Sequence, residues 1–153
     1  MKKCKTVVNL FSKENFTANH ANHTNKLKQG EILLKDECFK IYGCIFAVNR
    51  KLGAGFLEAV YQEALEIELR WKNIPFISQQ TLGILYDDIL LTNKYTADIV
   101  CYEKIIIEIK AVSKINNLHK AQLMNYLAVT GCKLGLLINF NSLPKAEIIR
   151  MVR

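Results

Sequence analysis

The sequence predicts an α/β fold in which a mixed β-sheet is flanked by helices. Two segments of helical periodicity precede a run of strand-like segments, and a third helical segment and a near-continuous apolar run follow them. Two helices, a run of strands, a third helix and a further strand, with a short last element at residues 145–152, are typical of such a sandwich. With 153 residues, half of them hydrophobic, the chain is long enough to bury a core without disulfides or metal staples.

The predicted helices have apolar residues at every third or fourth position. The first runs over residues 31–52 and ends at Gly53. The second is expected over residues 56–74, because a proline follows. The third covers residues 118–130 and is closed by Gly131.

The predicted strands are short and rich in β-branched and aromatic residues. They are expected at residues 76–82, 84–86, 89–91, 95–102 and 105–112. Asp87 and Asp88 form a turn between the second and third of them. Residues 134–140 are almost all apolar, which is typical of a strand covered on both faces.

The net charge of +7 is concentrated at one end of the chain. Residues 1–30 contain six lysines and one acidic residue, whereas the charges of the remainder nearly balance. We therefore expect a basic, irregular arm over residues 1–30 and one domain over residues 31–153. Such an arm can help a protein approach a polyanion or can be merely solvated. His20 and His23 have the spacing of half a metal site, but solvated surface histidines are the commoner case.

The sequence disfavours several classes of protein. No apolar run reaches the roughly 18 to 20 residues of a membrane span, and no apolar signal segment follows the first lysines, so a cytoplasmic protein without a membrane partner is expected. The five cysteines are odd in number and form no C-x-x-C pair. This pattern argues against a disulfide framework and a zinc knuckle and favours reduced, mostly buried thiols.

Charged residues interrupt the apolar segment at residues 105–111. Side chains alternate across a strand, so Glu108 and Lys110 point to one face. Half-buried charges are costly unless they are paired or bound to a metal. Taken alone, the Glu-x-Lys pattern is more often a solvated pair at a sheet edge.

Asp98 strengthens the functional interpretation, because it lies one hairpin away. A two-residue loop that pairs Tyr102 with Ile105 would turn Asp98 away from Glu108. A three-residue loop that pairs Cys101 with Ile105 would place the two carboxylates opposite each other. The predicted site therefore requires an odd-length loop or a bulge.

Two carboxylates on adjacent strands form a hard-oxygen site that suits Mg²⁺ or Mn²⁺. Such an ion polarises a phosphoryl group and lowers the pKa of a bound water, while Lys110 can orient that water or neutralise developing charge. This is the chemistry of phosphodiester hydrolysis.

The second and third helices add polar groups. His119, Gln122 and Tyr126 lie on one helical face, where Gln122 and Tyr126 can bind a phosphate or hold the lysine. A boundary face of satisfied polar groups explains them equally well. Glu58 and Tyr61 also share a face, although helix-dipole stabilisation alone accounts for a glutamate in a first turn.

Seven residues, Gly55-Phe56-Leu57-Glu58-Ala59-Val60-Tyr61, resemble the signature of the bacterial and archaeal GxxExxY proteins, a family placed in the PD-(D/E)xK nuclease superfamily. The similarity continues through residues 73–76, 97–98, 107–111, 119–127 and 134–140 and covers roughly residues 32–152. Ala97 replaces the proline of the superfamily name. Asn49 and Ala54 stand where the family has His and Pro.

The resemblance implies a restriction-endonuclease-like αβββαβ core with an extra N-terminal helix. It implies that Asp98 and Glu108 bind the metal, that the Ile109 carbonyl assists and that Lys110 is catalytic. It also adds Glu58 to the acidic cluster and makes Gln122 and Tyr126 a Q-x-x-x-Y element. The candidate catalytic residues are thus Glu58, Asp98, Glu108, Lys110, Gln122 and Tyr126, with Tyr61 and His119 as secondary candidates.

The leading hypothesis is a Mg²⁺-dependent nuclease, a hydrolase that cleaves the phosphodiester bonds of DNA. No residue excludes RNA as the substrate. The alternative is a nuclease-fold module that binds nucleic acid or a protein partner without cutting, which the nearly neutral body favours. A homodimer would give so small a domain a wider binding groove.

Overall fold

The computed structural model describes residues 32–153. The helices are α1 (Lys35–Leu52), α2 (Glu58–Trp71) and α3 (Asn117–Thr130). The strands are β1 (Phe76–Leu82), β2 (Leu85–Tyr86), β3 (Ile89–Leu90), β4 (Tyr95–Cys101), β5 (Ile105–Lys110), β6 (Leu134–Asn139) and β7 (Glu147–Val152). The predicted basic arm, with His20 and His23, lies outside the described residues, and its boundary stays a prediction.

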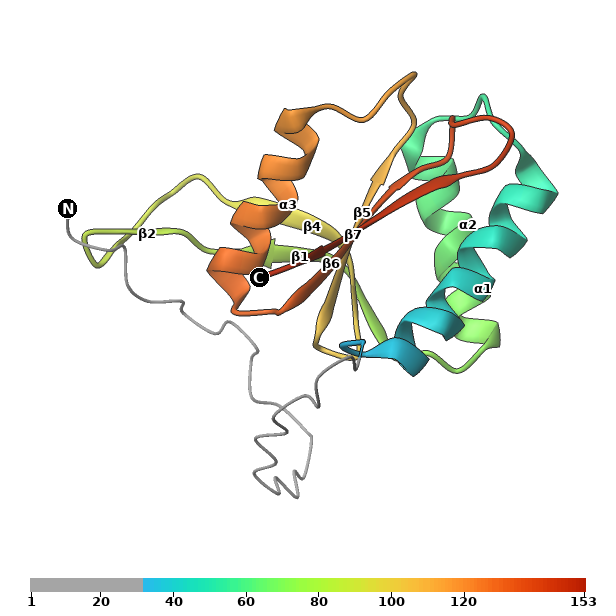
Figure 1. Ribbon diagram of the computed structural model, residues 1–153. Coiled ribbons are helices and arrows are strands. Elements are labelled where there is room, and N and C mark those ends of the chain that lie inside the picture. Colours follow the sequence, from blue (N-terminus) through green and yellow to red (C-terminus); the bar gives the residue numbers. More distant parts are fainter. Residues whose placement is uncertain (1–31) are drawn as a thin grey trace.

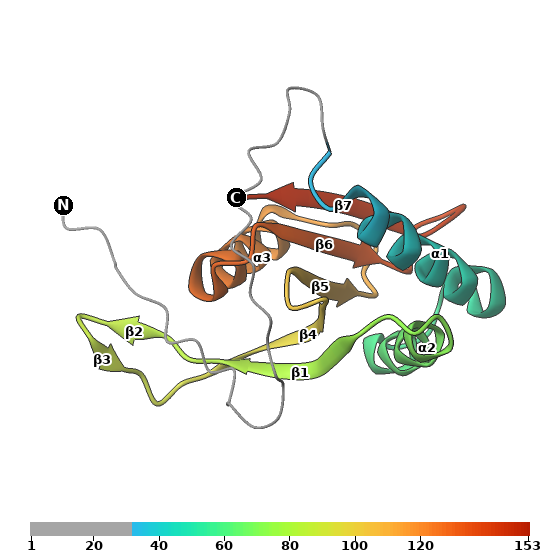
Figure 2. The ribbon, with the colours of Figure 1, turned by 90° about the horizontal axis from the view of Figure 1, so that it is seen from below.

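A five-stranded mixed sheet in the order β1-β4-β5-β6-β7 forms the centre of the fold (Figure 1). Only β5 and β6 run parallel, and α3 connects them, as a crossover between parallel strands requires. Helices α1 and α2 lie on one side of the sheet and α3 on the other (Figure 2). The predicted α/β class and the helix-flanked mixed sheet are confirmed.

Two apolar layers hold the helices against the sheet. Ile105, Ile107 and Ile109 of β5 are buried with residues of α1 and α2, whereas Ile106 is buried with residues of α3. Every residue of β6 is buried, so the expectation of a strand covered on both faces is confirmed. The alternation along β5 turns Glu108 and Lys110 toward the α3 side.

The hairpin between β4 and β5 has the three-residue loop that the candidate site requires. Cys101 pairs with Ile105, and the Lys104 N–H donates to the Cys101 carbonyl at 3.0 Å. Tyr102 and Glu103 adopt left-handed conformations with φ of 55° and 56°. With this register, Asp98 and Glu108 lie opposite each other.

The predicted strands β2 and β3 lie outside the main sheet. They form a separate hairpin in which Asp87 and Asp88 have φ of 47° and 65°, as a type I′ turn requires (Figure 2). Their side chains alternate too briefly to bury a face, and Tyr86, Ile89 and Leu90 are exposed. The strand predictions at residues 84–86 and 89–91 were correct to within one residue, and the two strands form a small sheet of their own.

Some predicted elements extended beyond the observed ones. Helix α2 begins at Glu58 rather than at residue 56, because the N-cap residue Leu57 is extended, with φ of −74° and ψ of 154°. Strand β5 ends at Lys110 because Val112 exchanges hydrogen bonds with the Asn139 side chain at 3.1 and 2.8 Å. A side-chain amide thus replaces the ladder where β5 ends.

Cys38, Cys44, Cys101 and Cys132 are free and buried, as expected for structural thiols. Burial raises the pKa of Cys101 to about 12, so this thiol stays protonated. Among residues 32–153, no helix combines the length and the apolarity that crossing a bilayer requires.

Candidate active site

The strands β4 and β5 separate at Asp98. Their backbone pairing ends at Ile99 and Ile107, one step before Asp98 would pair with Glu108. Instead, the Asp98 carboxylate reaches across the gap, and its Oδ2 accepts a hydrogen bond from the Ile109 N–H at 2.7 Å. A side chain therefore satisfies a backbone donor that the departing strand leaves free.

A backbone irregularity on the other side of β4 accompanies this fork. The register of β1 against β4 places Gln79 opposite Asp98, and the φ of Gln79 is 51°. Glutamine rarely adopts this left-handed conformation, and such strain is concentrated at functional sites. The Gln79 amide donates a hydrogen bond to Gln62 Oε1 at 2.7 Å, and the Gln79 side chain weakly opposes the rise that burial causes in the pKa of Asp98.

Glu108 is the most constrained acidic residue of the fork. Its relative exposure is 1%, and its Oε2 accepts a hydrogen bond from the Lys110 ammonium at 3.3 Å. Its Oε1 is buried without a hydrogen-bond partner among the described residues. Burial, followed by the nearby Asp98 carboxylate, raises the pKa of Glu108 from 4.5 to about 7, and Lys110 only partly opposes this shift. The structure therefore holds a carboxylate near its titration point at neutral pH.

Glu58 approaches the same end of β5 from the first turn of α2. Its Oε1 accepts a hydrogen bond from the Ala111 N–H at 3.1 Å, directly after the strand ends. The pKa of Asp98 is raised chiefly by burial; its bond to Ile109 and the charge of Lys110 lower it, and Glu58 raises it. Glu58 and Asp98 line one open pocket of about 660 Å³. The structure thus brings the α2 carboxylate to the fork.

The oxygen atoms of the fork fit a divalent cation. Among residues 32–153, no three His, Cys, Asp or Glu side chains cluster closely enough to hold a metal ion. The carboxylates that could contribute at the fork are those of Asp98 and Glu108. The Ile109 carbonyl can add a third, because the C=O and N–H of a strand residue point to the same side, and this N–H points to Asp98. A cation would also give the unpartnered Oε1 of Glu108 a counter-charge.

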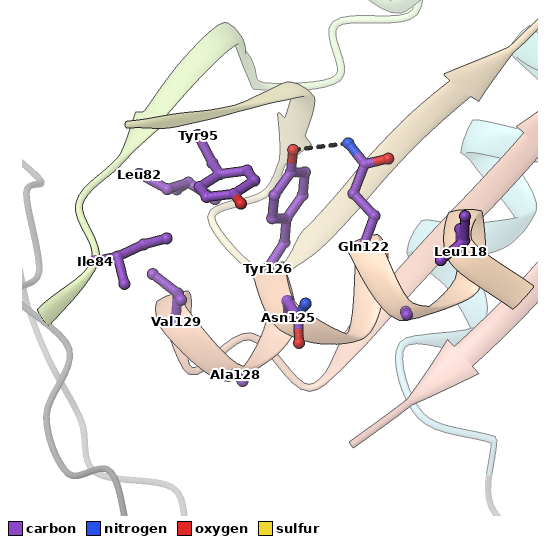
Figure 3. A pocket seen from close by; sticks show the side chains of 10 residues that line it. Leu82, Ile84, Tyr95, Leu118, Gln122, Asn125, Tyr126, Ala128 and Val129 are labelled. Carbon is purple, nitrogen blue, oxygen red and sulfur yellow. Dashed lines mark hydrogen bonds between the residues drawn. The ribbon is translucent and has the colours of Figure 1, made fainter. Parts of the chain in front are cut away.

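Tyr126 of α3 lies near this cluster, and Gln122 is its hydrogen-bond partner on the same helix. The Gln122 amide donates a hydrogen bond to the Tyr126 hydroxyl at 2.8 Å (Figure 3). Burial raises the pKa of Tyr126, and the negative charges of Glu108 and Asp98 raise it further, whereas Gln122 and Lys110 lower it. The phenol therefore lies within electrostatic reach of both carboxylates and stays protonated.

The two secondary candidates have structural roles. Tyr61 is fully buried, its ring stacks on Phe140 with centroids 4.5 Å apart, and its hydroxyl donates to the Gly53 carbonyl at 2.8 Å. The His119 N–H donates to the Asn116 side chain at 3.0 Å, and the Asn116 N–H donates to His119 Nδ1 at 3.2 Å. This reciprocal pair caps α3. Both residues hold helices that carry site residues.

Two asparagines that sequence reasoning missed fix the chain beyond Lys110. Asn139 is fully buried and binds both the N–H and the C=O of Val112. The Asn141 side chain donates to the Ala111 carbonyl at 2.9 Å and accepts from the Gly55 N–H at 2.8 Å. These bonds join the end of β5 to the start of α2, which positions Glu58. The sequence feature that could have identified Asn139 is its position as a polar residue at the end of an otherwise apolar strand.

Comparisons with known proteins place the whole of this cluster inside one match. A family model described as the PD-(D/E)XK nuclease superfamily matches residues 35–151. Searches of the curated proteins and of the solved structures found no match to the chain.

Proposed function

Because the chain belongs to the PD-(D/E)XK nuclease superfamily, we propose that it is a divalent-metal-dependent nuclease that hydrolyses the phosphodiester bonds of DNA. The observation that carries this proposal is Glu108, a buried carboxylate whose Oε1 is unpartnered and whose Oε2 contacts Lys110. A fold accepts such a costly group where the group has a functional partner. On residues 55–61, we also infer that the chain falls in the GxxExxY branch.

The fork residues divide the work of hydrolysis. A Mg²⁺ or Mn²⁺ ion bound by Asp98, Glu108 and the Ile109 carbonyl would supply Lewis acidity and lower the pKa of an attacking water. Lys110, held by its bond to Glu108, orients the nucleophile and offsets negative charge on the phosphoryl group. Glu58 extends the acidic cluster on the side of the open pocket.

The phenol of Tyr126 is suited to a phosphate oxygen. Its hydroxyl oxygen already accepts a hydrogen bond from the Gln122 amide, so its own proton remains available to donate. Donation to a non-bridging oxygen would position the scissile phosphate against the strand carboxylates. Gln122 then acts through Tyr126 as a positioning residue.

Cleavage of labelled DNA by the purified full chain tests the proposal. Single-stranded DNA, double-stranded DNA and an RNA strand are each incubated with Mg²⁺ or Mn²⁺. Lys110→Ala should lower the rate by about 100-fold or more, as the loss of a transition-state contact does. Lys104→Ala is the matched control, because Lys104 is an exposed lysine in the hairpin loop at the other end of β5. Equal cleavage by wild type and Lys110→Ala would refute the proposal.

A nuclease-fold module that binds without cutting is the second candidate. The nearly balanced charge outside residues 1–30 favours it, because a stand-alone nuclease usually holds its substrate in a basic groove. Calorimetric titration with Mg²⁺ separates the candidates. For a nuclease, the titration should show a heat of Mg²⁺ binding that is lost in Glu108→Gln. A module that does not cut should show no heat of Mg²⁺ binding that depends on Glu108. Sedimentation of the same samples tests whether two copies associate.

A further inference from the structure

A second pocket adjoins the candidate site on the α3 side of the sheet. Its volume is about 390 Å³, and it lies between α3 and the ends of β1 and β4 near the β2–β3 hairpin (Figure 3). Leu82 and Val129 contribute apolar walls, and Tyr95 contributes an aromatic ring. The size and the mostly apolar lining are those of a small-ligand site.

The pocket shares Gln122 and Tyr126 with the candidate active site. These two side chains are hydrogen-bonded to each other, and the Tyr126 phenol lies within electrostatic reach of Glu108 and Lys110. A group bound here would therefore contact Tyr126, whose hydroxyl we propose to hold the phosphate. A nucleotide has this arrangement, because its flat base lies next to a phosphate.

The aromatic lining suits a nucleobase. The rings of Tyr95 and Tyr126 meet edge to face, with centroids 5.9 Å apart and an interplanar angle of 67°. Tyr95 remains 48% exposed, so part of its ring is free to stack on a flat partner. The Asn125 amide, also in the lining, offers both a donor and an acceptor to the edge of a base.

We propose that this pocket binds the unstacked base of the nucleotide next to the scissile phosphate, which makes DNA with unpaired bases the preferred substrate. The inference rests on the proposed nuclease function and names its substrate class. In a duplex, the base must leave its pair and its stack before it can enter, whereas a single strand or a frayed end does not incur that cost. The pocket is tolerant of sequence, because every base presents a flat face.

Binding in EDTA tests the pocket without relying on cleavage. Fluorescence anisotropy measures the affinity of the full chain for a short labelled single strand and for the matching blunt duplex. Tyr95→Ala should weaken single-strand binding roughly fivefold or more, which is the effect of losing one base–aromatic stack. Tyr95→Phe keeps the ring and should bind within about twofold of wild type. Tyr86→Ala is the matched control, because Tyr86 is an exposed aromatic residue outside this pocket.

A second measurement uses a series of single-stranded DNA molecules, each lacking the base at one position. Its result for wild type does not depend on whether a variant folds. Wild type should show one position at which removal of the base weakens binding roughly fivefold, and Tyr95→Ala should lose this dependence. The inference is overturned if removal of a base at every position weakens the binding of wild type and of Tyr95→Ala to the same extent. It is also overturned if wild type binds the duplex as tightly as the single strand. Both results are expected if a side chain of a protein partner occupies the pocket instead.

The two proposals fail in different ways. Base-dependent binding without any cleavage that depends on Lys110 would overturn the nuclease function and leave the base pocket standing. Cleavage that depends on Lys110, together with a flat response to base removal, would leave the nuclease function standing and overturn the base pocket.

Discussion

Replacing Glu108 with glutamine removes one negative charge and keeps the shape of the side chain, so it isolates the cost of the buried carboxylate. The folded chain holds the Glu108 proton up to about pH 7, whereas the ordinary value is 4.5. Between these values, unfolding releases a proton, and the free energy of unfolding falls as the pH rises. The stability linked to Glu108 is therefore fully present below about pH 4.5 and is lost as the pH rises through about 7.

The size of this effect follows from the two pKa values. Roughly 1.4 kcal/mol for each pKa unit gives an upper bound of roughly 3 kcal/mol. Between pH 5 and pH 8, wild type should thus lose roughly 2–3 kcal/mol relative to Glu108→Gln, which cannot ionise at this position. Because urea lowers the free energy of unfolding by about 1–3 kcal/mol per molar, the two midpoints should separate by roughly 1 M or more.

Urea unfolding in EDTA, followed by circular dichroism at pH 5 and pH 8, measures this difference. Glu103→Gln, an exposed glutamate in the β4–β5 loop, is the matched control and should leave the pH dependence unchanged. Addition of Mg²⁺ at pH 8 should stabilise wild type more than Glu108→Gln, because a ligand that binds the folded state stabilises it. If the stability of wild type and Glu108→Gln changes equally between the two pH values, the buried-carboxylate argument is wrong.

Three further substitutions test how the site is held, each by urea unfolding. Gly135→Ala would bring a Cβ within 2.7 Å of the Leu123 side chain and should cost about 1–3 kcal/mol, whereas Gly43→Ala, with open space around it, should not destabilise. Asn116→Ala removes the cap of α3 and should cost about 0.5–2 kcal/mol; an unchanged midpoint would show that the cap is dispensable. Tyr61→Phe deletes the buried hydroxyl bond and should cost about 0.5–1.5 kcal/mol, so a gain in stability would contradict its anchoring role.

Local patterns predicted most of the fold. The alternation in residues 105–110 assigned Glu108 and Lys110 to one face, and the structure confirms that face as the α3 side. Helical periodicity located the three helices of residues 32–153 within a few residues, because the 3.6-residue repeat of apolar positions is a local property of the sequence. The site residues on β5 and α3 could be proposed for the same reason.

Other features depended on contacts between distant segments. The sequence allowed either a two-residue or a three-residue loop after β4, and only the Cys101–Ile105 pairing brings Asp98 to Glu108. Sequence reasoning also grouped Tyr61 with Glu58, yet packing against Phe140 places the Tyr61 ring in the core. Asn139 was missed because its partners lie 27 residues away along the chain.

The sequence by itself determined which residues are candidates for the chemistry and which side of each element they occupy, because backbone geometry and hydrophobic periodicity are local properties. Tertiary structure alone decided that β4 leaves β5 at Asp98, that α2 brings Glu58 to the end of β5, and that Glu108 is buried. The raised pKa of Glu108 exists only in the fold, since it arises from burial of the side chain and, to a smaller extent, from the nearby Asp98 carboxylate.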